Sequence, residues 1–152
     1  MSLPFHFYAL PFHKLSLQEL YSLMQLRQEV FVVEQDCPYI DADGKDPEAT
    51  HILGFGEGGR LMACSRLLPP GVSYPGYASI GRVASSPTVR GMGAGKALMQ
   101  HSIEWCGQLF PGAPIKISAQ CYLTRFYEGF GFEQEGQEYL EDGIPHIGMV
   151  KS

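Results

Sequence analysis

The first half of the chain combines one helical and three extended patterns of apolar residues. Apolar side chains follow a helical spacing after Ser16 and predict one buried helix face, made of Leu17, Leu20, Tyr21, Met24 and Phe31. Ser16 and Glu19 have the spacing of a capping box, which places the start of this helix at Ser16. Residues 5–9, 50–55 and 61–67 have the composition of strands, and Gly58-Gly59 predicts a hairpin between the last two.

The second half of the chain predicts a strand, a helix and another strand in succession. Residues 78–84 are typical of a strand, and a glycine-rich turn follows them. Residues 93–109 predict a helix that ends before Pro111, with an inner face of Ala94, Leu98, Trp105 and Leu109. An alternating pattern at 115–120 then predicts the next strand.

The order of these elements indicates the fold class. A short helix over 122–131 and two extended segments joined at Asp142-Gly143 complete the chain. A strand–helix–strand crossover of this length implies a parallel pair with right-handed connection, whereas the hairpins imply antiparallel pairs. We therefore expect an α/β protein (α+β mixed sheet), in which helices flank a central mixed sheet.

Composition restricts the classes of partner. A length of 152 residues fits one domain that spans residues 1–152. The net charge is -5 at pH 7 and Lys and Arg do not cluster, which disfavours a nucleic-acid partner. No run of about 18 apolar residues predicts a membrane span, and the first residues lack the basic start and apolar run of a signal peptide.

The cysteines and histidines are scattered along the chain. Cys37, Cys64, Cys106 and Cys121 form no Cys-x-x-Cys pair, which predicts free thiols in a reducing compartment and hence a cytoplasmic location. The histidines lie far from one another and from the cysteines in sequence, so we expect no metal site.

The turn between the strand at 78–84 and the helix at 93–109 has the composition of a phosphate site. Its glycines can leave backbone N–H groups free at a helix N-terminus, where the helix dipole also favours an anion. A Walker A loop is excluded, because Ala97 follows Gly95-Lys96 and Arg90 holds the place of the leading glycine. The dinucleotide fingerprint also fails, since the glycine series stops at Gly95. A glycine-rich turn without a ligand is the alternative.

Three segments carry a resemblance to a known family. Arg90-Gly91-Met92-Gly93-Ala94-Gly95, after Arg82-Val83-Ala84, resembles the acetyl-CoA pyrophosphate loop of the GCN5-related N-acetyltransferases (GNAT). The segment 122–132, which contains Phe126-Tyr127-Glu128 and ends in Gly131-Phe132, resembles the later signature of that family. The segment 26–46 and the tail Glu141-Asp142-Gly143-Ile144-Pro145-His146-Ile147 resemble its ElaA-like branch, so the likeness covers nearly the whole chain.

The resemblance implies the GNAT-like acyl-CoA N-acyltransferase fold and acetyl-CoA as the acyl donor. In that fold two adjacent parallel strands splay apart and hold the pantetheine arm in the gap. The residues it would place around the cofactor are Arg82, Val83, Ala84, Arg90, Gly91, Met92, Gly93, Ala94, Gly95, Lys96, Gln120 and Tyr127. A backbone N–H near Val83 or Ala84 would stabilise the oxyanion.

The reaction implied is acetyl transfer to a primary amine, on a small molecule or a peptide, by direct attack in a ternary complex. Tyr127 stands at the place of the family's general acid and would protonate the leaving thiolate. No carboxylate lies on the strand 78–84, so Glu34 and His51 are the candidate bases, with proton loss to a water near Gln120 as the alternative. Cys121 has no obvious activating base nearby and is expected to be a buried thiol.

The loop 36–48 carries Asp36, Asp41, Asp43, Asp46 and Glu48. Two interpretations are equally weighted: the loop receives a cationic acceptor, or it is a solvated surface loop. A third is that Arg82 pairs with this loop and holds it over the site.

Two other functions remain open, and so does the oligomeric state, a homodimer included. The segment 26–31 and the acidic loop also resemble acyl-homoserine-lactone synthases, although no basic patch for a carrier protein is found. A non-catalytic CoA-binding sensor would keep the glycine-rich turn and would not need Tyr127.

Overall fold

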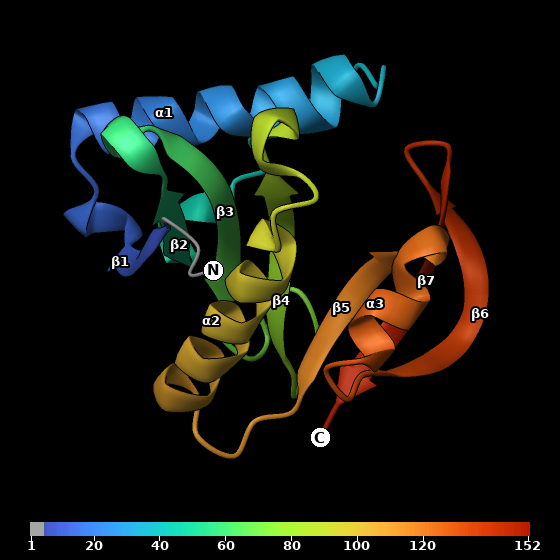
Figure 1. The fold of residues 1–152 in the computed structure, drawn as a ribbon. Coiled ribbons are helices and arrows are strands. Elements are labelled where there is room, and N and C mark those ends of the chain that lie inside the picture. Colours follow the sequence, from blue (N-terminus) through green and yellow to red (C-terminus); the bar gives the residue numbers. More distant parts are fainter. Residues whose placement is uncertain (1–4) are drawn as a thin grey trace.

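One seven-stranded mixed sheet organises the computed structural model, which describes residues 5–152 (Figure 1). The strand order is β1-β2-β3-β4-β5-β7-β6. The strands are β1 (His6–Pro11), β2 (Thr50–Phe55), β3 (Leu61–Leu68), β4 (Ala78–Ser85), β5 (Ile115–Gln120), β6 (Glu133–Glu141) and β7 (Ile144–Lys151). Only β4 and β5 run parallel, joined by a crossover through α2 (Ala94–Leu109). The expected mixed sheet, including its parallel pair, is confirmed.

Helices cover the two faces of the sheet unequally. On β2, Ile52 packs in the cluster that contains Leu98 and Met99 of α2, whereas Leu53 packs against Leu23 of α1 (Leu17–Arg27). Adjacent strand residues point to opposite faces, so α1 and α2 lie on opposite sides of the sheet. The short helix α3 (Thr124–Glu128) shares the α2 side, as Tyr127 belongs to the same cluster. Among residues 5–152, no helix lies over the α1 side of β5, β7 and β6 (Figure 1).

The start of α1 follows the sequence expectation. The Glu19 amide donates to Ser16 Oγ at 3.0 Å, and the Ser16 amide donates to Glu19 Oε1 at 2.8 Å. This capping box satisfies two N–H groups that the first turn of a helix leaves free. At its other end α1 continues into a π-helical segment, η2 (Gln28–Glu34), in which the Gln35 amide bonds the Val30 carbonyl five residues back.

The predicted buried face of this first helix is correct only in part, because Leu20, Met24 and Phe31 are half-buried whereas Leu17 and Tyr21 are not. Leu17 and Tyr21 are 87% and 76% exposed, and the face that packs on the sheet contains Leu23, Leu26 and Arg27. The buried face is rotated around the helix relative to the predicted one. Its centre is Arg27, which forms buried ion pairs, so a charged residue stands where the apolar spacing requires an apolar one.

The inner face of α2 is predicted only in part. Ala94 and Leu98 are buried, but Leu109 is exposed and Trp105 is half-buried. Ser102 takes an inner position because its hydroxyl bonds the Leu98 carbonyl and Ser65 Oγ, both at 2.7 Å. A hydrogen-bonded serine can occupy a core position that an apolar pattern cannot reveal.

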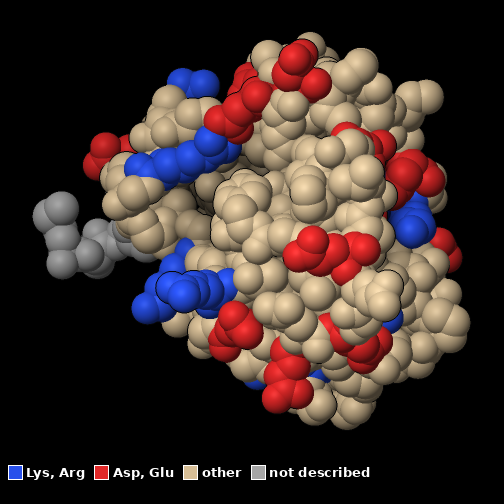
Figure 2. All heavy atoms as spheres, turned by 90° about the vertical axis from the view of Figure 1, so that its right-hand side faces the viewer, with Lys and Arg blue, Asp and Glu red and all other residues tan. Residues whose placement is uncertain are grey.

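Strand β6 forms one edge of the sheet, and all nine of its residues are exposed. Its pairing with β7 is interrupted between Glu135 and Tyr139. Figure 2 views the molecule from this side and shows acidic side chains spread over the surface. Charge and irregular pairing are two features that keep an edge strand from pairing with another chain.

Candidate active site

A cleft opens where β4 and β5 separate. The two strands pair only at Ala78 with Ile115 and at Ser79 with Lys116, although β4 continues to Ser85 and β5 to Gln120. The cleft has a volume of about 1090 Å³ and is lined by both strands, the start of α2, α3 and the loop 36–45. The expected splay of two parallel strands is therefore present, with space between them for an extended group.

The glycine-rich turn presents free backbone N–H groups to this cleft. Gly91 and Gly93 adopt positive φ angles of 81° and 80°, a conformation that glycine enters without steric cost. The first helical hydrogen bond of α2 is donated by the Ala97 amide to the Gly93 carbonyl at 3.1 Å. The amides of Ala94, Gly95 and Lys96 come before it and have no partner within the helix. Because the dipole of this 16-residue helix adds positive potential, the turn suits a phosphate group.

Arg90 of this turn already has a carboxylate partner. Both its terminal nitrogens bind Glu34 of η2, with Nη2 2.6 Å from Oε1, and Nη2 also donates to the Ser85 carbonyl at 3.0 Å. The hydrogen bond to Arg90 lowers the pKa of Glu34. Two residues predicted for different tasks, cofactor binding and base catalysis, are thus bound to each other at the mouth of the cleft.

Strand β4 bulges where it borders the cleft. Ala84 pairs with Cys64 and Gly81 with Arg66, so β4 has one residue more than β3 across this interval. Arg82 lies in the bulge with a φ of 47°, an unusual value for a residue with a side chain. The bulge sends the Arg82 side chain toward the loop 36–48, and Val83 and Ala84 follow it along the cleft.

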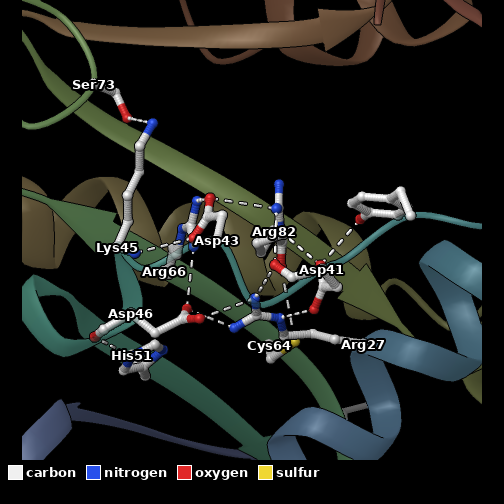
Figure 3. Close-up of polar contacts among 11 residues, drawn as sticks. Arg27, Asp41, Asp43, Lys45, Asp46, His51, Cys64, Arg66, Ser73 and Arg82 are labelled. Atoms are coloured by element: carbon white, nitrogen blue, oxygen red, sulfur yellow. Dashed lines mark hydrogen bonds and ion pairs between the residues drawn. The ribbon is translucent and has the colours of Figure 1, made fainter. Parts of the chain in front are cut away.

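Three arginines hold the acidic loop in place (Figure 3). Arg27, 1% exposed, bonds Asp41 Oδ2 and Asp46 Oδ1, each at 2.7 Å. The other two arginines, Arg66 and Arg82, bind the same loop at Asp43, Asp46 and Asp41. We call these six residues the Arg–Asp network. Its three positive and three negative charges cancel.

The network decides between the interpretations of the acidic loop. Burial alone would raise the pKa values of Asp43 and Asp46, but hydrogen bonds and charges of Arg66 and Arg27 outweigh it and lower both. These aspartates are therefore ionised and already paired with arginines, so they are not free for a cationic acceptor, although Asp43 keeps contact with solvent. The expectation that Arg82 pairs with the loop is the one that the structure supports.

Tyr127 lies at the inner end of the cleft on α3. It is 8% exposed, packs edge-on against Phe126 and Phe132, and lines the space between the strands. Burial raises its pKa to about 12, so the phenol is protonated at neutral pH. A neutral phenol in this place can donate a proton or a hydrogen bond into the cleft.

His146 lies across from Gln120 and also lines the cleft, and the sequence did not single it out for chemistry. Its Nδ1–H donates to the Ile144 carbonyl at 2.7 Å, which leaves Nε2 as the basic nitrogen. Glu141 Oε2 is 3.4 Å from Nε2. The only available signal was its place in the tail 141–147, because the residue is separated from every other site residue in sequence.

Comparison with known proteins identifies the family. Residues 50–152 match the family model described as "Acetyltransferase (GNAT) domain". Protein ElaA of Escherichia coli is 44% identical over 140 residues, which cover 91% of this chain and 90% of ElaA. The chain belongs to the GNAT superfamily, on its ElaA-like branch.

Solved GNAT structures agree with the fold described above. The crystal structure of an acyl-CoA N-acyltransferase from Pseudomonas aeruginosa is 42% identical, with a TM-score of 0.92 over 97% of this chain and 99% of that one. The crystal structure of E. coli ElaA is 41% identical, with a TM-score of 0.90 at the same coverage. GNAT acyltransferases use acyl-CoA donors and amine acceptors.

Most of the predicted site residues line the cleft of this GNAT domain. Those in place are Glu34, Arg82, Val83, Ala84, Arg90, Gly91, Gly93, Ala94, Gly95, Lys96, Gln120 and Tyr127. Met92 belongs to the same turn but its side chain is exposed and does not line the cleft. Cys121 is half-buried rather than buried, lies outside the cleft, and has a pKa raised by desolvation and by Glu138.

His51 is a correction to the predicted site. It is fully buried beneath the Arg–Asp network, outside the cleft, and its Nε2–H donates to the Asp46 carbonyl at 3.1 Å. Burial lowers its pKa, so this imidazole is neutral. A side chain with no path to the acceptor cannot take its proton, and His51 is a structural residue of β2 that bonds to the loop.

Among residues 5–152 no group of three or more His, Cys, Asp and Glu side chains is placed to hold a metal ion. Within the same range no helix has the length and apolar character needed to cross a membrane.

Proposed function

We propose that this GNAT protein transfers an acetyl group from acetyl-CoA to a primary amine, by direct attack in a ternary complex. The observation that carries the proposal is the continuity of one cleft. It runs from the free amides at the start of α2, through the gap between β4 and β5, to the phenol of Tyr127. Those are the parts needed to bind a diphosphate, an extended arm and a thioester sulfur.

The residues fit coenzyme A by their chemistry. The amides of Ala94, Gly95 and Lys96 would hold the diphosphate, with positive charge from Arg90 and Lys96. The backbone of Arg82 to Ala84 has no strand beside it on the cleft side, and the pantetheine amides would pair there as an added strand does.

The chain would support each stage of transfer with a different group. As the amine attacks the thioester carbon, a backbone N–H at Val83 or Ala84 would stabilise the oxyanion, a contribution of about 3–4 kcal/mol. As the C–S bond breaks, Tyr127 would give its proton to the thiolate. Its raised pKa, about 12, keeps the phenol protonated for this step at neutral pH.

The proton of the amine needs a different acceptor from the two that the sequence proposed. Glu34 is bound to Arg90 and His51 is buried outside the cleft. His146 fits the task better, because it lines the cleft, its Nδ1–H is held by the Ile144 carbonyl, and its Nε2 lies 3.4 Å from Glu141 Oε2. The Glu141 carboxylate would stabilise the imidazolium that forms.

Binding of coenzyme A is the decisive experiment, and α2 offers a matched pair of variants. Gly95 lines the cleft, whereas Gly107 of the same helix is exposed and an added Cβ there meets nothing within 4 Å. Gly95→Val is expected to weaken CoA binding at least about tenfold by calorimetry, and Gly107→Val to leave it unchanged. Equal affinities in the two variants, or no affinity in the unaltered protein, would refute the proposal.

Turnover separates the enzyme from the alternatives. Release of free thiol from acetyl-CoA in the presence of amines is expected, with a product heavier by one acetyl group. A product that carries a longer acyl chain would favour the acyl-homoserine-lactone synthase alternative. Binding without turnover on a broad amine panel would favour a CoA sensor.

The compartment and the assembly are part of the proposal. All four cysteines are free, which suits a reducing compartment and hence the cytoplasm. A homodimer stays a prediction that sedimentation at several concentrations would test.

A further inference from the structure

The side of the cleft opposite the helices α2 and α3 forms a groove, which we call the acceptor groove. Ile117 and Ala119 of β5 pack in the core with α2, so the alternate residues Lys116, Ser118 and Gln120 point to the other face. That face of β5, with Glu141 at the end of β6 and Ile144 and His146 at the start of β7, is the floor of the groove. The loops 36–48 and 69–77 form its wall, where Lys45 and Tyr74 line the cleft.

One end of the acceptor groove carries negative charge and a base. His146 pairs with Gln120 at the point where β5 ends, next to the gap that leads to Tyr127. Glu141 lies beside His146, and its other oxygen accepts from Ser118 Oγ at 3.4 Å. An ammonium group would be attracted to this end, and it could lose its proton to His146.

The other end carries two lysines. Lys45 Nζ donates to Ser73 Oγ at 3.0 Å and, among residues 5–152, forms no ion pair (Figure 3). The neighbouring Arg–Asp network is neutral, so it does not balance this charge. Lys116 Nζ lies 5.1 Å from the ring centre of Tyr74 and 3.1 Å from Glu135 Oε1, a carboxylate that is half exposed.

The two ends are separated along β5. Lys116 is four residues from Gln120, which is about 13 Å along a strand. The lysine side chains cover part of that length. A ligand that spans the groove would thus have an amine at one end and an anionic group several bonds away.

We infer that the acceptor is a primary amine with a distal anionic group, a carboxylate or a phosphate, which Lys45 and Lys116 bind. The inference rests on the proposed function. A half-buried lysine without a counter-ion lacks the compensation that charged groups usually have, and an anionic ligand would supply it. The amine of the same ligand would then lie beside His146 and Glu141, with its reacting nitrogen toward the thioester.

Acceptors that differ only at the distal group test this inference. The probes are 6-aminohexanoate, 6-aminohexyl phosphate and 6-aminohexanamide, each assayed for acetyl transfer and each titrated into CoA-saturated protein. We expect kcat/KM and affinity for one anionic probe to exceed those for the amide at least about tenfold, the effect of one hydrogen bond to a charged group. The preferred anionic probe shows whether the distal group of the acceptor is a carboxylate or a phosphate.

Lysine variants assign the effect to residues. Lys45→Met and Lys116→Met are each expected to reduce the ratio of kcat/KM for the anionic probe to kcat/KM for the amide, with CoA affinity unchanged. Lys14→Met is the control, because Lys14 is exposed and lies outside the cleft. Retained CoA affinity shows that a variant is folded.

The outcomes separate this inference from the proposed function. Equal binding and equal transfer for the anionic and neutral probes would overturn the inference while acetyl transfer stands. A preference that survives in both lysine variants would also overturn it. A binding preference without any transfer would support the groove and refute the enzyme.

Discussion

The guanidinium of Arg90 binds both carboxylate oxygens of Glu34, and this contact joins the glycine-rich turn to the π-helical segment η2. Both side chains are partly exposed, so the pair contributes about 1 kcal/mol or less to stability. Its importance is functional, because the diphosphate of coenzyme A would compete with Glu34 for the same arginine.

Glu34→Gln tests whether this carboxylate is a partner of Arg90 or a base. We expect KM for acetyl-CoA to fall about two- to fivefold, because Arg90 is released, and kcat to stay within about threefold. Steady-state kinetics with Glu29→Gln, an exposed glutamate of the same segment outside the cleft, provide the control. A hundredfold loss of kcat would restore Glu34 as the general base.

Tyr127→Phe removes the proposed proton donor and keeps the ring that packs on Phe126. We expect kcat/KM to fall at least about a hundredfold, with CoA affinity unchanged. Stopped-flow thiol release and calorimetry measure the two quantities. Tyr21→Phe on α1 should change neither, since Tyr21 lies outside the cleft. A loss of less than threefold in Tyr127→Phe would rule out the acid role.

His146→Gln tests the proposed base. We expect kcat to fall about a hundredfold or more, with CoA affinity unchanged. His101→Gln is the matched control, because His101 stacks on Phe7 and lies outside the cleft. A variant with normal kcat would return the proton transfer to water.

Arg27→Met tests the Arg–Asp network. The substitution leaves Asp41 and Asp46 buried without their main partner, and loss of one member of a buried ion pair costs about 3–5 kcal/mol. Urea unfolding should show this loss, whereas Arg60→Met, at an exposed residue without an ion pair, should stay within about 0.5 kcal/mol. Equal stabilities would mean that the loop does not depend on Arg27.

Acid should destabilise the fold in two stages. Burial lowers the pKa of His51, so below about pH 6.5 the unfolded chain binds a proton that the folded chain does not, and stability falls. Asp43 and Asp46 also have lowered pKa values, so their contribution is complete above about pH 4 and is lost as pH falls through those lowered values. Urea titrations from pH 7.5 to 3 measure both stages.

His51→Gln separates the stages. The variant should lose the stability change that begins near pH 6.5 and keep the change below pH 4. His13→Gln, at an exposed histidine, should keep both. If His51→Gln had the pH dependence of the unaltered protein, the first stage would belong to another group.

Local features of the site could be predicted from sequence, and distant ones could not. The turn from Arg90 to Lys96 and the parallel strand pair follow from contiguous residues and a crossover of known length, whereas the splay of that pair is implied only by the family resemblance. The Arg–Asp network could not be predicted in full, because its arginines come from α1, β3 and β4 and meet one loop only in the fold.

Charged and polar residues inside the core explain the remaining errors. Arg27 made the true inner face of α1 look polar, so the exposed Leu17 and Tyr21 were expected to be buried. His51 is a candidate base in the sequence because the sequence does not show its burial. That burial depends on packing beneath the loop 36–48, which meets β3 and β4 only in the fold. His146 belongs to no recognisable sequence pattern. It faces Gln120 only through the register of β5 and β7, and its bond to Ile144 is to a backbone carbonyl.

The brief contact between β4 and β5 has a mechanical consequence. Within residues 5–152, two residue pairs make up the strand pairing between the four-stranded half of the sheet and the three-stranded half, so backbone hydrogen exchange should be fastest at this seam among the central strands. An acyl-CoA arm that bonds to both strands would connect β4 and β5 where they do not pair with each other. The protein would then gain rigidity across its middle whenever its donor is loaded, and lose it each time the spent thiol departs.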